Sequence, residues 1–339
     1  MRVRLKDIAE KTGFSVNTVS LALNDSPRIS EETRQLIKES ANEFNYVPNK
    51  AARSLITRKS KLIGLIVREF NNNILSMVAA ELERSLYALG YNLVLVTSAY
   101  PKNELEVLRT LESQQVDGIF MYPSLPMDHR VIEYIHQMSC PVVLLSFGDY
   151  ELFTDAIYID REYAAYLATS YLISLGHKKI AFFCGASSSV LSPMDGERLR
   201  GYCRALNEAG LTYNPSYTVL LPQGQYRAGY DAARALYHCS SITAILGCND
   251  AIACGAMQYY LEQGVRIPED ISFVSNDSTE IAAFSAVPMT ATRYNVEALT
   301  AKAVEVMMQR LESNEREGYI RCAIPSTLDI RSSTAAPRE

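Results

Sequence analysis

Hydrophobic residues at helical spacing predict three short helices within residues 5–44. The first helix covers residues 5–11, and the second runs from residue 16 to about Leu23. Gly13 lies between them in a tight turn, because glycine tolerates the positive φ that such turns need. Two short helices around a glycine turn, followed by a third packing helix, form a helix-turn-helix module.

Serines stand at the expected starts of the second and third helices. The side chains of Ser15 and Ser30 can accept hydrogen bonds from the backbone of the first turn. Glu31 and Glu32 follow Ser30, where the helix dipole favours negative charge.

The second helix has two different faces at 100° per residue. The face expected to pack inward holds Val19, Ala22 and Leu23. The opposite face holds Asn17, Ser20 and Leu21, with Val16 on the border. The helix therefore has one side available for a partner.

From residue 62 onward, short apolar runs alternate with longer helical patterns. The runs predict strands over residues 62–67, 92–96, 118–122, 142–145, 156–159, 180–184, 244–246 and 271–274. Helical patterns include residues 75–89, 104–114, 163–175, 197–209 and 251–263, and several end at glycine. This alternation favours parallel sheets covered by helices, and its length favours two lobes.

Charge is distributed unevenly along the 339 residues, whose net charge is −5. Residues 1–61 hold 12 Lys and Arg against 7 Asp and Glu, and the remainder holds 21 against 31. A basic module on an acidic body indicates a polyanionic partner for that module, or else a solvated charged face.

Several protein classes are disfavoured by composition. No apolar run approaches the ~18–20 residues of a membrane span, and the N-terminus lacks the apolar stretch of a signal peptide. The 7 cysteines form no C-x-x-C pair, which is typical of reduced thiols in a cytoplasmic protein. The 4 histidines have no metal-ligand spacing, so we expect neither a metal site nor a cofactor.

Residues 5–55 resemble the DNA-binding headpiece of the lactose/galactose repressor (LacI/GalR) family. The matching features are the DIA…G.S..TVS..LN signature, the ISEETR helix start and the NYVPN.AARSL segment. The resemblance implies that the second helix reads DNA. Its candidate DNA-binding residues are Ser15, Val16, Asn17, Thr18, Ser20, Leu21 and Asn24.

Chemistry divides these residues into two groups. Asn17 can pair with adenine, and Val16 or Leu21 can contact a thymine methyl group. The short polar residues suit phosphate contacts, which set register on DNA. Leu21 departs from the arginine of many family members and predicts an unusual half-site; the alternative is a packing residue.

Residues 49–57 read as a short helix after Pro48, too short to be stable alone. The resemblance implies a hinge that orders on DNA, where Leu55 would wedge into the minor groove beside its twin from a second subunit. Lys50 and Arg53 could meet phosphates there. Alternatively, Leu55 is an ordinary linker residue that touches the core.

The body resembles the periplasmic-binding-protein-like core of the same family. LIGLIV, VDGIFMYPS, LISLGHKKIAFFCG, LGCNDAIACGAM and RIPEDISFVSNDS match family segments in the family's order. The resemblance implies two doubly wound parallel-sheet lobes with three crossings between them. The expected domains are an all-α headpiece (1–48), a hinge helix and linker (49–61), and an α/β effector-binding and dimerisation core (62–331). Lobe one would cover about 62–160 plus 292–320, and lobe two about 161–291 plus 321–331.

Five polar residues are candidates for effector binding. Arg198, Asn249 and Asp277 match family pocket positions, expected just past strand ends, and Ser124 and Ser146 end two earlier strands. Alternatives are an interlobe salt bridge for Arg198 and Asp277, and a helix cap for Asn249.

Five further residues complete this interpretation. We assign Asp250 to helix capping and His177 to a structural role. Tyr122 or Tyr226, like Tyr100, could supply the aromatic ring that many relatives stack on their ligand.

The resulting prediction is a transcription regulator, more specifically a repressor. A homodimer would bind a pseudo-palindromic operator, and a small molecule between the lobes would change DNA affinity. An effector that stabilises the hinge would act as a corepressor, and one that disrupts it as an inducer. The chain lacks the leucine-rich C-terminal helix of family tetramers, which favours a dimer.

Two other functions remain as alternatives. A solute-binding protein for transport fits the body but leaves the headpiece unexplained. An enzyme is disfavoured because the chain lacks G-x-G-x-x-G, G-x-x-x-x-G-K-[ST] and G-x-S-x-G motifs, so no catalytic residue is predicted.

Overall fold

The computed structural model describes residues 3–46, 59–68, 73–99, 103–123, 127–146, 154–187, 190–191, 193–222, 225–238, 241–313 and 318–338. The chain divides into two compact units, Met1–Ser60 and Lys61–Glu339.

The first unit is the predicted three-helix module, with α1 (Leu5–Thr12), α2 (Val16–Leu23) and α3 (Glu31–Glu43). Gly13 has a φ of 73° and ends α1, as its position predicts. Ser15 and Ser30 cap α2 and α3 by accepting hydrogen bonds from the N–H groups of Thr18 and Thr33. The predicted turn and caps are therefore confirmed.

Apolar side chains from all three helices form the core of this module. Its fully buried members include Ile8, Val19, Ala22 and Ile37. Leu36 shares their helical spacing but is 48% exposed, so the apolar stripe of α3 is narrower than the sequence pattern indicates. The module has a complete small core of its own.

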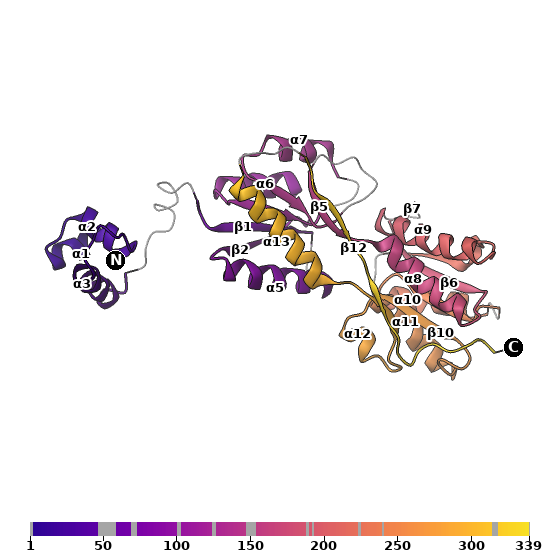
Figure 1. The fold of residues 1–339 in the computed structure, drawn as a ribbon. Helices are drawn as coiled ribbons and strands as arrows, with labels where there is room; N and C mark the ends of the chain where they lie inside the picture. Colours follow the sequence, from indigo (N-terminus) through magenta and orange to yellow (C-terminus); the bar gives the residue numbers. More distant parts are fainter. Residues whose placement is uncertain are drawn as a thin grey trace. The chain divides into compact units, whose positions relative to one another are not determined.

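Lobe one of the second unit is built on a six-stranded sheet with strand order β12-β5-β4-β3-β1-β2. Its strands are β1 (Leu62–Val67), β2 (Asn92–Thr97), β3 (Gly118–Met121), β4 (Val142–Leu144), β5 (Asp155–Ile159) and β12 (Arg321–Ile324). Its helices are α5 (Asn73–Ala88), α6 (Glu104–Ser113), α7 (His129–Gln137) and α13 (Val296–Glu312). Figure 1 shows α13 beside α5, and these two helices pack against each other.

Lobe two is built on a seven-stranded sheet with order β13-β11-β10-β9-β6-β7, in which β8 also pairs with β6. Its strands are β6 (Ile180–Ser187), β7 (Val190–Leu191), β8 (Thr218–Pro222), β9 (Ala244–Gly247), β10 (Ser272–Asp277), β11 (Thr290–Arg293) and β13 (Thr327–Asp329). Its helices are α8 (Arg161–Ser174), α9 (Pro193–Glu208), α10 (Tyr226–Leu236), α11 (Asp250–Glu262) and α12 (Glu280–Ala283), with a short 3-10 turn at Pro215–Tyr217.

Both sheets have the doubly wound order that the strand–helix alternation predicts. In lobe one all strands are parallel, and β1 lies between β2 and β3. In lobe two β6 lies between β8 and β9 in the same parallel arrangement, whereas β7 and β13 are antiparallel. Each sheet therefore has a switch point next to its first strand, where such folds bind ligands.

Glycine ends four of the predicted helices as expected. Gly90, Gly176, Gly210 and Gly264 have φ between 70° and 102°, a region that residues with a Cβ rarely adopt.

The three crossings between the lobes are present, but two predicted boundaries are wrong. Residues 292–293 belong to β11 in lobe two, so the chain crosses after Arg293 rather than before Thr292. β12 pairs with β5 in lobe one, so the last crossing follows Ile324 rather than residue 320 (Figure 1). The short, half-exposed run Arg321–Ile324 shows no hydrophobic pattern, and only its pairing with β5 reveals a strand.

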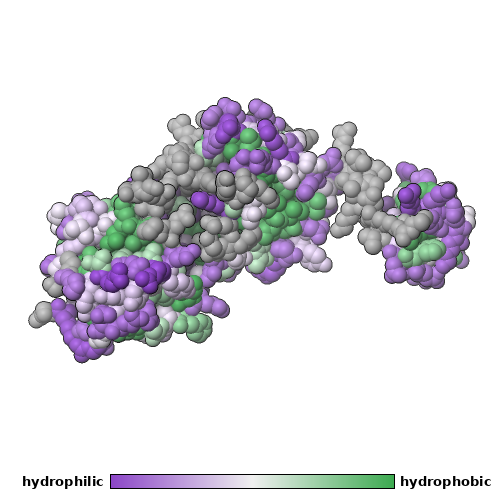
Figure 2. Space-filling model, turned by 180° about the vertical axis from the view of Figure 1, so that it is seen from behind, coloured by the Kyte–Doolittle hydropathy of each residue, from purple (hydrophilic) through white to green (hydrophobic). Residues whose placement is uncertain are grey.

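No helix within the described ranges is long and apolar enough to cross a membrane. Hydrophobic side chains nevertheless reach the surface of the second unit, as the green patches in Figure 2 show. Its exposed large hydrophobic side chains include Met77, Tyr87 and Leu95 in lobe one and Tyr226 and Phe284 in lobe two.

Candidate functional site

The exposed face of α2 carries the residues that the sequence predicts for DNA binding. Val16 is 45% exposed, while its neighbours Val19 and Ala22 are fully buried against the other helices. All seven candidates of this module are at least partly exposed, namely Ser15, Val16, Asn17, Thr18, Ser20, Leu21 and Asn24. The module thus presents side chains of the predicted kinds on one helix face.

Three of these side chains also have local structural roles. The Ser15 and Thr18 hydroxyls lie 2.9 Å apart, and the same Ser15 hydroxyl caps α2. Asn24 ends the helix, and its amide donates to the Ser20 carbonyl at 2.7 Å. These contacts fix the ends of α2, and they leave the side chains of four candidates without a capping role: Val16, Asn17, Ser20 and Leu21.

Ion pairs occupy many of the basic residues of the three helices. Lys6 pairs with Glu10, Lys38 pairs with Asp25, and Lys11 pairs with Glu43. Arg34 pairs with Glu31 at 2.9 Å. The predicted hinge residues Lys50, Arg53 and Leu55 lie outside the described residues.

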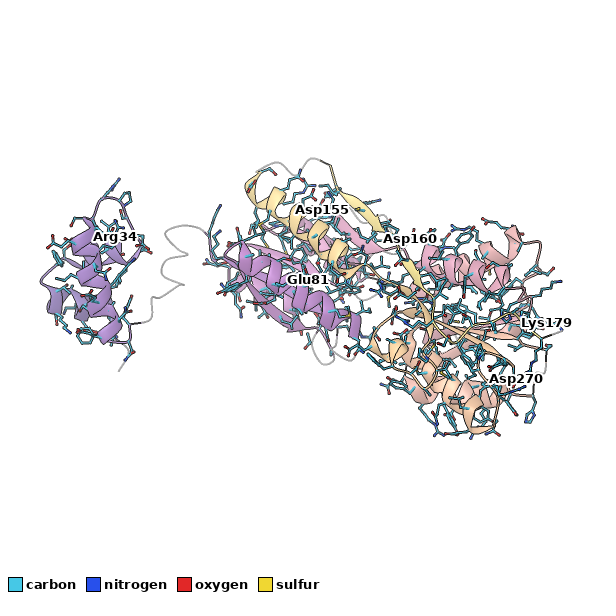
Figure 3. The ribbon with its side chains drawn as sticks, turned by 60° about the horizontal axis from the view of Figure 1, so that its bottom comes forward. Arg34, Glu81, Asp155, Asp160, Lys179 and Asp270 are labelled. Carbon is cyan, nitrogen blue, oxygen red and sulfur yellow. The ribbon has the colours of Figure 1, made fainter. Side chains whose placement is uncertain are left out.

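A second group of polar side chains, termed here the interlobe cluster, lies where the lobes meet. It consists of Tyr122, Ser146, Arg161, Asp195, Glu197, Arg198, Asp277 and Tyr294. Tyr122 and Ser146 follow β3 and β4 of lobe one, and the charged residues come from lobe two. Figure 3 labels Asp160, the neighbour of Arg161, at the junction of the two lobes.

Arg161 connects the two lobes. It is the first residue of α8 and only 4% exposed. Its guanidinium donates to Glu197 in lobe two at 3.4 Å, and to Tyr122 and Ser146 of lobe one at 3.3 and 3.4 Å.

Arg198 forms the second half of the cluster. It donates to Asp195 Oδ1 at 3.0 Å and to the Tyr294 hydroxyl at 3.2 Å, while its buried Nε has no partner among the described residues. Gly185 on β6 makes room for Asp195, because a Cβ there would lie 2.8 Å from its carboxylate. Arg198 lies within helix α9, not directly after a strand as predicted.

Burial controls the ionisation of the acidic groups. It raises the pKa of Asp277 well above its ordinary value, and the nearby Asp250 adds to the effect while Arg198 and Arg161 oppose it. Burial likewise raises the pKa of Glu197 against the opposing charges of Arg161 and Arg198. The pKa of the Tyr294 hydroxyl rises to about 12, mainly through burial.

Asn249 caps α11, accepting from the Ile252 N–H at 2.8 Å, so the capping alternative is confirmed for it. The prediction that Asp250 caps this helix is wrong. Its carboxylate instead accepts from the Ser275 hydroxyl and from the backbone and hydroxyl of Thr279, which holds the turn after β10. The neighbouring Asn249 takes the capping position because it directly precedes the helix.

Asp277 ends β10 as predicted, with a φ of 104° that exceeds the usual range for a residue with a side chain. The structural role of His177 is confirmed, since its buried ring contacts Thr243, Ser272 and the Ala335 carbonyl. Ser124 and Tyr100 lie outside the described residues.

Of the two candidate tyrosines that the structure describes, Tyr122 reaches the interlobe cluster and Tyr226 does not. Tyr226 instead lines a groove on lobe two, with a volume of about 810 Å³, between α10, α11 and α12. Sequence reasoning missed Arg161 and Tyr294. Each stands at a crossing between the lobes: Arg161 follows the end of β5 by two residues, and Tyr294 directly follows the end of β11. This position after a strand was the sequence feature that could have identified both residues.

Among the described residues, no group of three or more His, Cys, Asp or Glu side chains is arranged to hold a metal ion. None of the six cysteines in the described part of the chain is joined in a disulfide.

Two family models match the chain. Residues 4–49 match the model described as bacterial regulatory proteins, lacI family, and residues 169–334 match a periplasmic binding protein-like domain. These ranges cover the helix-turn-helix module and most of lobe two.

Curated relatives match nearly the whole chain. The ribose operon repressor of Haemophilus influenzae is 33% identical over 331 residues, covering 97% of this chain and 98% of the relative. The transcriptional repressor PurR of Vibrio atlanticus is 31% identical over 322 residues, covering 92% of this chain and 93% of the relative.

Solved structures agree with these relatives. A lac repressor dimer bound to operator and the anti-inducer ONPF has a TM-score of 0.87 at 25% identity, covering 99% of this chain and 100% of that chain. A complex of the regulator CelR with cellobiose has a TM-score of 0.70 at 26% identity, covering 98% and 100%. The chain belongs to the LacI family of bacterial regulatory proteins, and it is a DNA-binding transcriptional regulator with an effector-binding core.

Proposed function

We propose that this regulator represses transcription by binding a pseudo-palindromic operator as a homodimer, under the control of a small molecule bound between its lobes. The observation that carries the proposal is the exposed face of α2. Val16, Asn17 and Leu21 stand on it above a fully buried core. Asn17 would read adenine, and the two apolar residues would contact thymine methyl groups.

The flanking short polar residues would bind phosphates and set the register of the helix in the major groove. Beyond the headpiece, Lys50 and Arg53 would bind phosphates and Leu55 would wedge into the minor groove. The division into headpiece (1–48), hinge and linker (49–61) and core (62–331) belongs to the same proposal, with the lobe boundaries moved to Arg293 and Ile324.

The groove on lobe two supports a dimer. Phe284 is 84% exposed beside it, and Tyr226 is half-exposed on its wall. Below it, α10 and α11 approach closely at Gly229 and Gly255, where a Cβ would collide with backbone carbonyls. A rigid apolar groove with an exposed aromatic beside it fits a second copy of this chain, because isologous interfaces repeat one self-complementary patch.

The effector site we propose is the interlobe cluster, with Arg198, Asp277 and Ser146 as binding residues. Asn249 and Ser124, of which Ser124 lies outside the described residues, belong to the same proposal. Donor forks and acceptor carboxylates suit a hydroxyl-rich ligand. One relative is named for a ribose operon, and another was solved with cellobiose. A sugar or related metabolite is accordingly the class we propose.

The alternatives have less support. A solute-binding protein would leave the exposed face of α2 without a role, and the relatives described above are transcription regulators. We likewise propose that the chain has no catalytic activity, and that it acts in the cytoplasm, associated with the nucleoid when bound to DNA.

Selection from a randomised DNA library at fixed salt tests this proposal, since phosphate contacts make affinity depend on salt. We expect enrichment of a two-fold symmetric motif, both for the wild type and for a surface variant such as Arg200→Gln. Folded protein that enriches no motif, with or without metabolite extract, would contradict the proposal.

A further inference from the structure

Arg161 makes only long hydrogen bonds to the described residues around it. Its one carboxylate partner among the described residues, Glu197, is reached by one nitrogen at 3.4 Å. Its other partners, Tyr122 and Ser146, are neutral hydroxyls at 3.3 and 3.4 Å. A guanidinium has five N–H donors and binds carboxylate or phosphate most strongly through two parallel, shorter hydrogen bonds.

A second buried arginine of the same chain shows what a completed pair looks like. Arg310 on α13 donates to both oxygens of Asp155, at 2.8 Å each, and both side chains are less than one-tenth exposed. Figure 3 labels Asp155 within lobe one. Arg161 is more deeply buried than Arg310, yet it has no bidentate acceptor among the described residues.

The charges around Arg161 also leave room for an anion. Arg198 already has Asp195 at 3.0 Å, so these two charges balance. The pKa values of Glu197 and Asp277 are raised by burial, so both carboxyl groups hold protons more readily than in water. Arg161 itself faces Glu197 across one contact of 3.4 Å rather than a bidentate pair. The buried Nε of Arg198, without a partner among the described residues, adds an unused donor.

We propose that the effector carries an anionic group, a carboxylate or a phosphate, which binds Arg161 bidentately at the junction of the lobes. Tyr122 and Ser146, now held by Arg161, would be released to bind the hydroxyl groups of the ligand. The N-terminus of α8, where Arg161 stands, adds a favourable dipole. The inference rests on the proposed function, and it narrows the effector from any hydroxyl-rich metabolite to an acidic one.

The test uses a small-molecule extract of bacterial cells, separated by anion exchange into a neutral pool and an anionic pool. Each pool is added to the full chain at matched ionic strength, and the melting temperature is measured. We expect the anionic pool to raise the melting temperature and the neutral pool to leave it unchanged. Phosphatase treatment of the anionic pool then distinguishes the sources, because only a phosphate-bearing ligand loses its effect.

Variants connect the effect to Arg161. Arg161→Gln should require roughly 10- to 100-fold more of the anionic pool for the same shift, since a charge-assisted hydrogen bond is lost. Arg161→Lys keeps the charge without the fork and should lie in between. Arg200→Gln, an exposed arginine of α9 that pairs with Glu162, is the matched control and should respond like the wild type. If Arg161→Gln does not fold, the comparison of Arg161→Lys with Arg200→Gln decides.

Three results would overturn the inference: a shift caused by the neutral pool, equal responses of Arg161→Lys, Arg161→Gln and the wild type, or no shift from either pool. The DNA selection is run in parallel on the same protein. A symmetric motif without any response to the anionic pool refutes the anionic effector alone, whereas loss of both results refutes the proposed function as well.

Discussion

The headpiece and the interlobe cluster place functional side chains in opposite ways. In the headpiece, one helix of eight residues carries the side chains proposed to bind DNA, and leaves them exposed. In the cluster, side chains from residues 122 to 294 converge from several elements and two lobes, and most of them are buried. A surface that reads DNA can be built from local sequence alone, whereas a site that responds to lobe movement needs contributions from both lobes.

The largest expected effect is a loss of stability in the core unit that leaves the stability of the headpiece unchanged. Asp155→Ala would leave Arg310 buried without its partner and also remove the acceptor of the Ile320 N–H. We expect the core to lose about 3–5 kcal/mol in unfolding free energy. Urea unfolding followed by probes in each unit measures this.

Asp270→Ala is the control, because its partners Arg266 and Arg338 are largely exposed, and it should cost less than ~1 kcal/mol. The headpiece should unfold unchanged in both variants. Equal losses in both units would show that the units are not independent in stability.

Asn17→Ala sharpens the comparison from the DNA side. Loss of an adenine contact should cost roughly 1–3 kcal/mol per half-site on the selected operator, with unchanged stability because the side chain is exposed. Fluorescence anisotropy at fixed salt measures the affinity of each variant for operator DNA and for random DNA. Ser20→Ala, which removes a proposed phosphate contact, should weaken both DNAs alike; a similar uniform loss for Asn17→Ala would exclude base reading by that residue.

The two capping serines provide a smaller effect within the headpiece. Ser15→Ala and Ser30→Ala each remove a side-chain acceptor at a helix start, and each should destabilise the headpiece by about 1 kcal/mol. Thermal unfolding of the headpiece measures the loss. Only Ser15→Ala should also weaken DNA binding beyond its effect on stability, and equal weakening by Ser30→Ala would assign Ser15 to capping alone.

The smallest effect is a change in the slope of stability against pH. The pKa of Asp277 is raised in the folded protein. Its contribution to the free energy of unfolding is therefore fully present at pH values below the ordinary pKa of 3.8, and it is lost as the pH rises through the folded-state pKa. Asp277→Asn cannot ionise, so the core stability of this variant should fall less over that range. Urea unfolding at several pH values measures the slope, and an unchanged slope would contradict a raised pKa of Asp277 in the folded protein.

Sequence predicts well what depends on neighbours along the chain. The capping roles of Ser15 and Ser30, the turn at Gly13 and the strands β1 to β6, β9 and β10 follow from local spacing, and the structure confirms them. The short strands β7, β8, β11, β12 and β13 were not predicted. The family resemblance adds the two lobes and names Arg198 and Asp277 as candidates for effector binding.

Sequence predicts poorly what depends on partners distant in the chain. Arg161 contacts Tyr122 and Ser146 because the chain passes from β5 of lobe one to α8 of lobe two at the junction of the lobes. Asp250 precedes a helix like a capping residue, but the neighbouring strand β10 supplies its hydrogen bonds. The run at β12 becomes a strand only through its pairing with β5.

The central claim is that the headpiece and the interlobe cluster are coupled, and reciprocity tests it most directly. Operator affinity is measured with and without the ligand purified from the active pool, and ligand affinity with and without the selected operator. The account predicts the same factor of change in both directions, about 5- to 150-fold for typical coupling. Operator affinity that is unaffected by saturating ligand would contradict it.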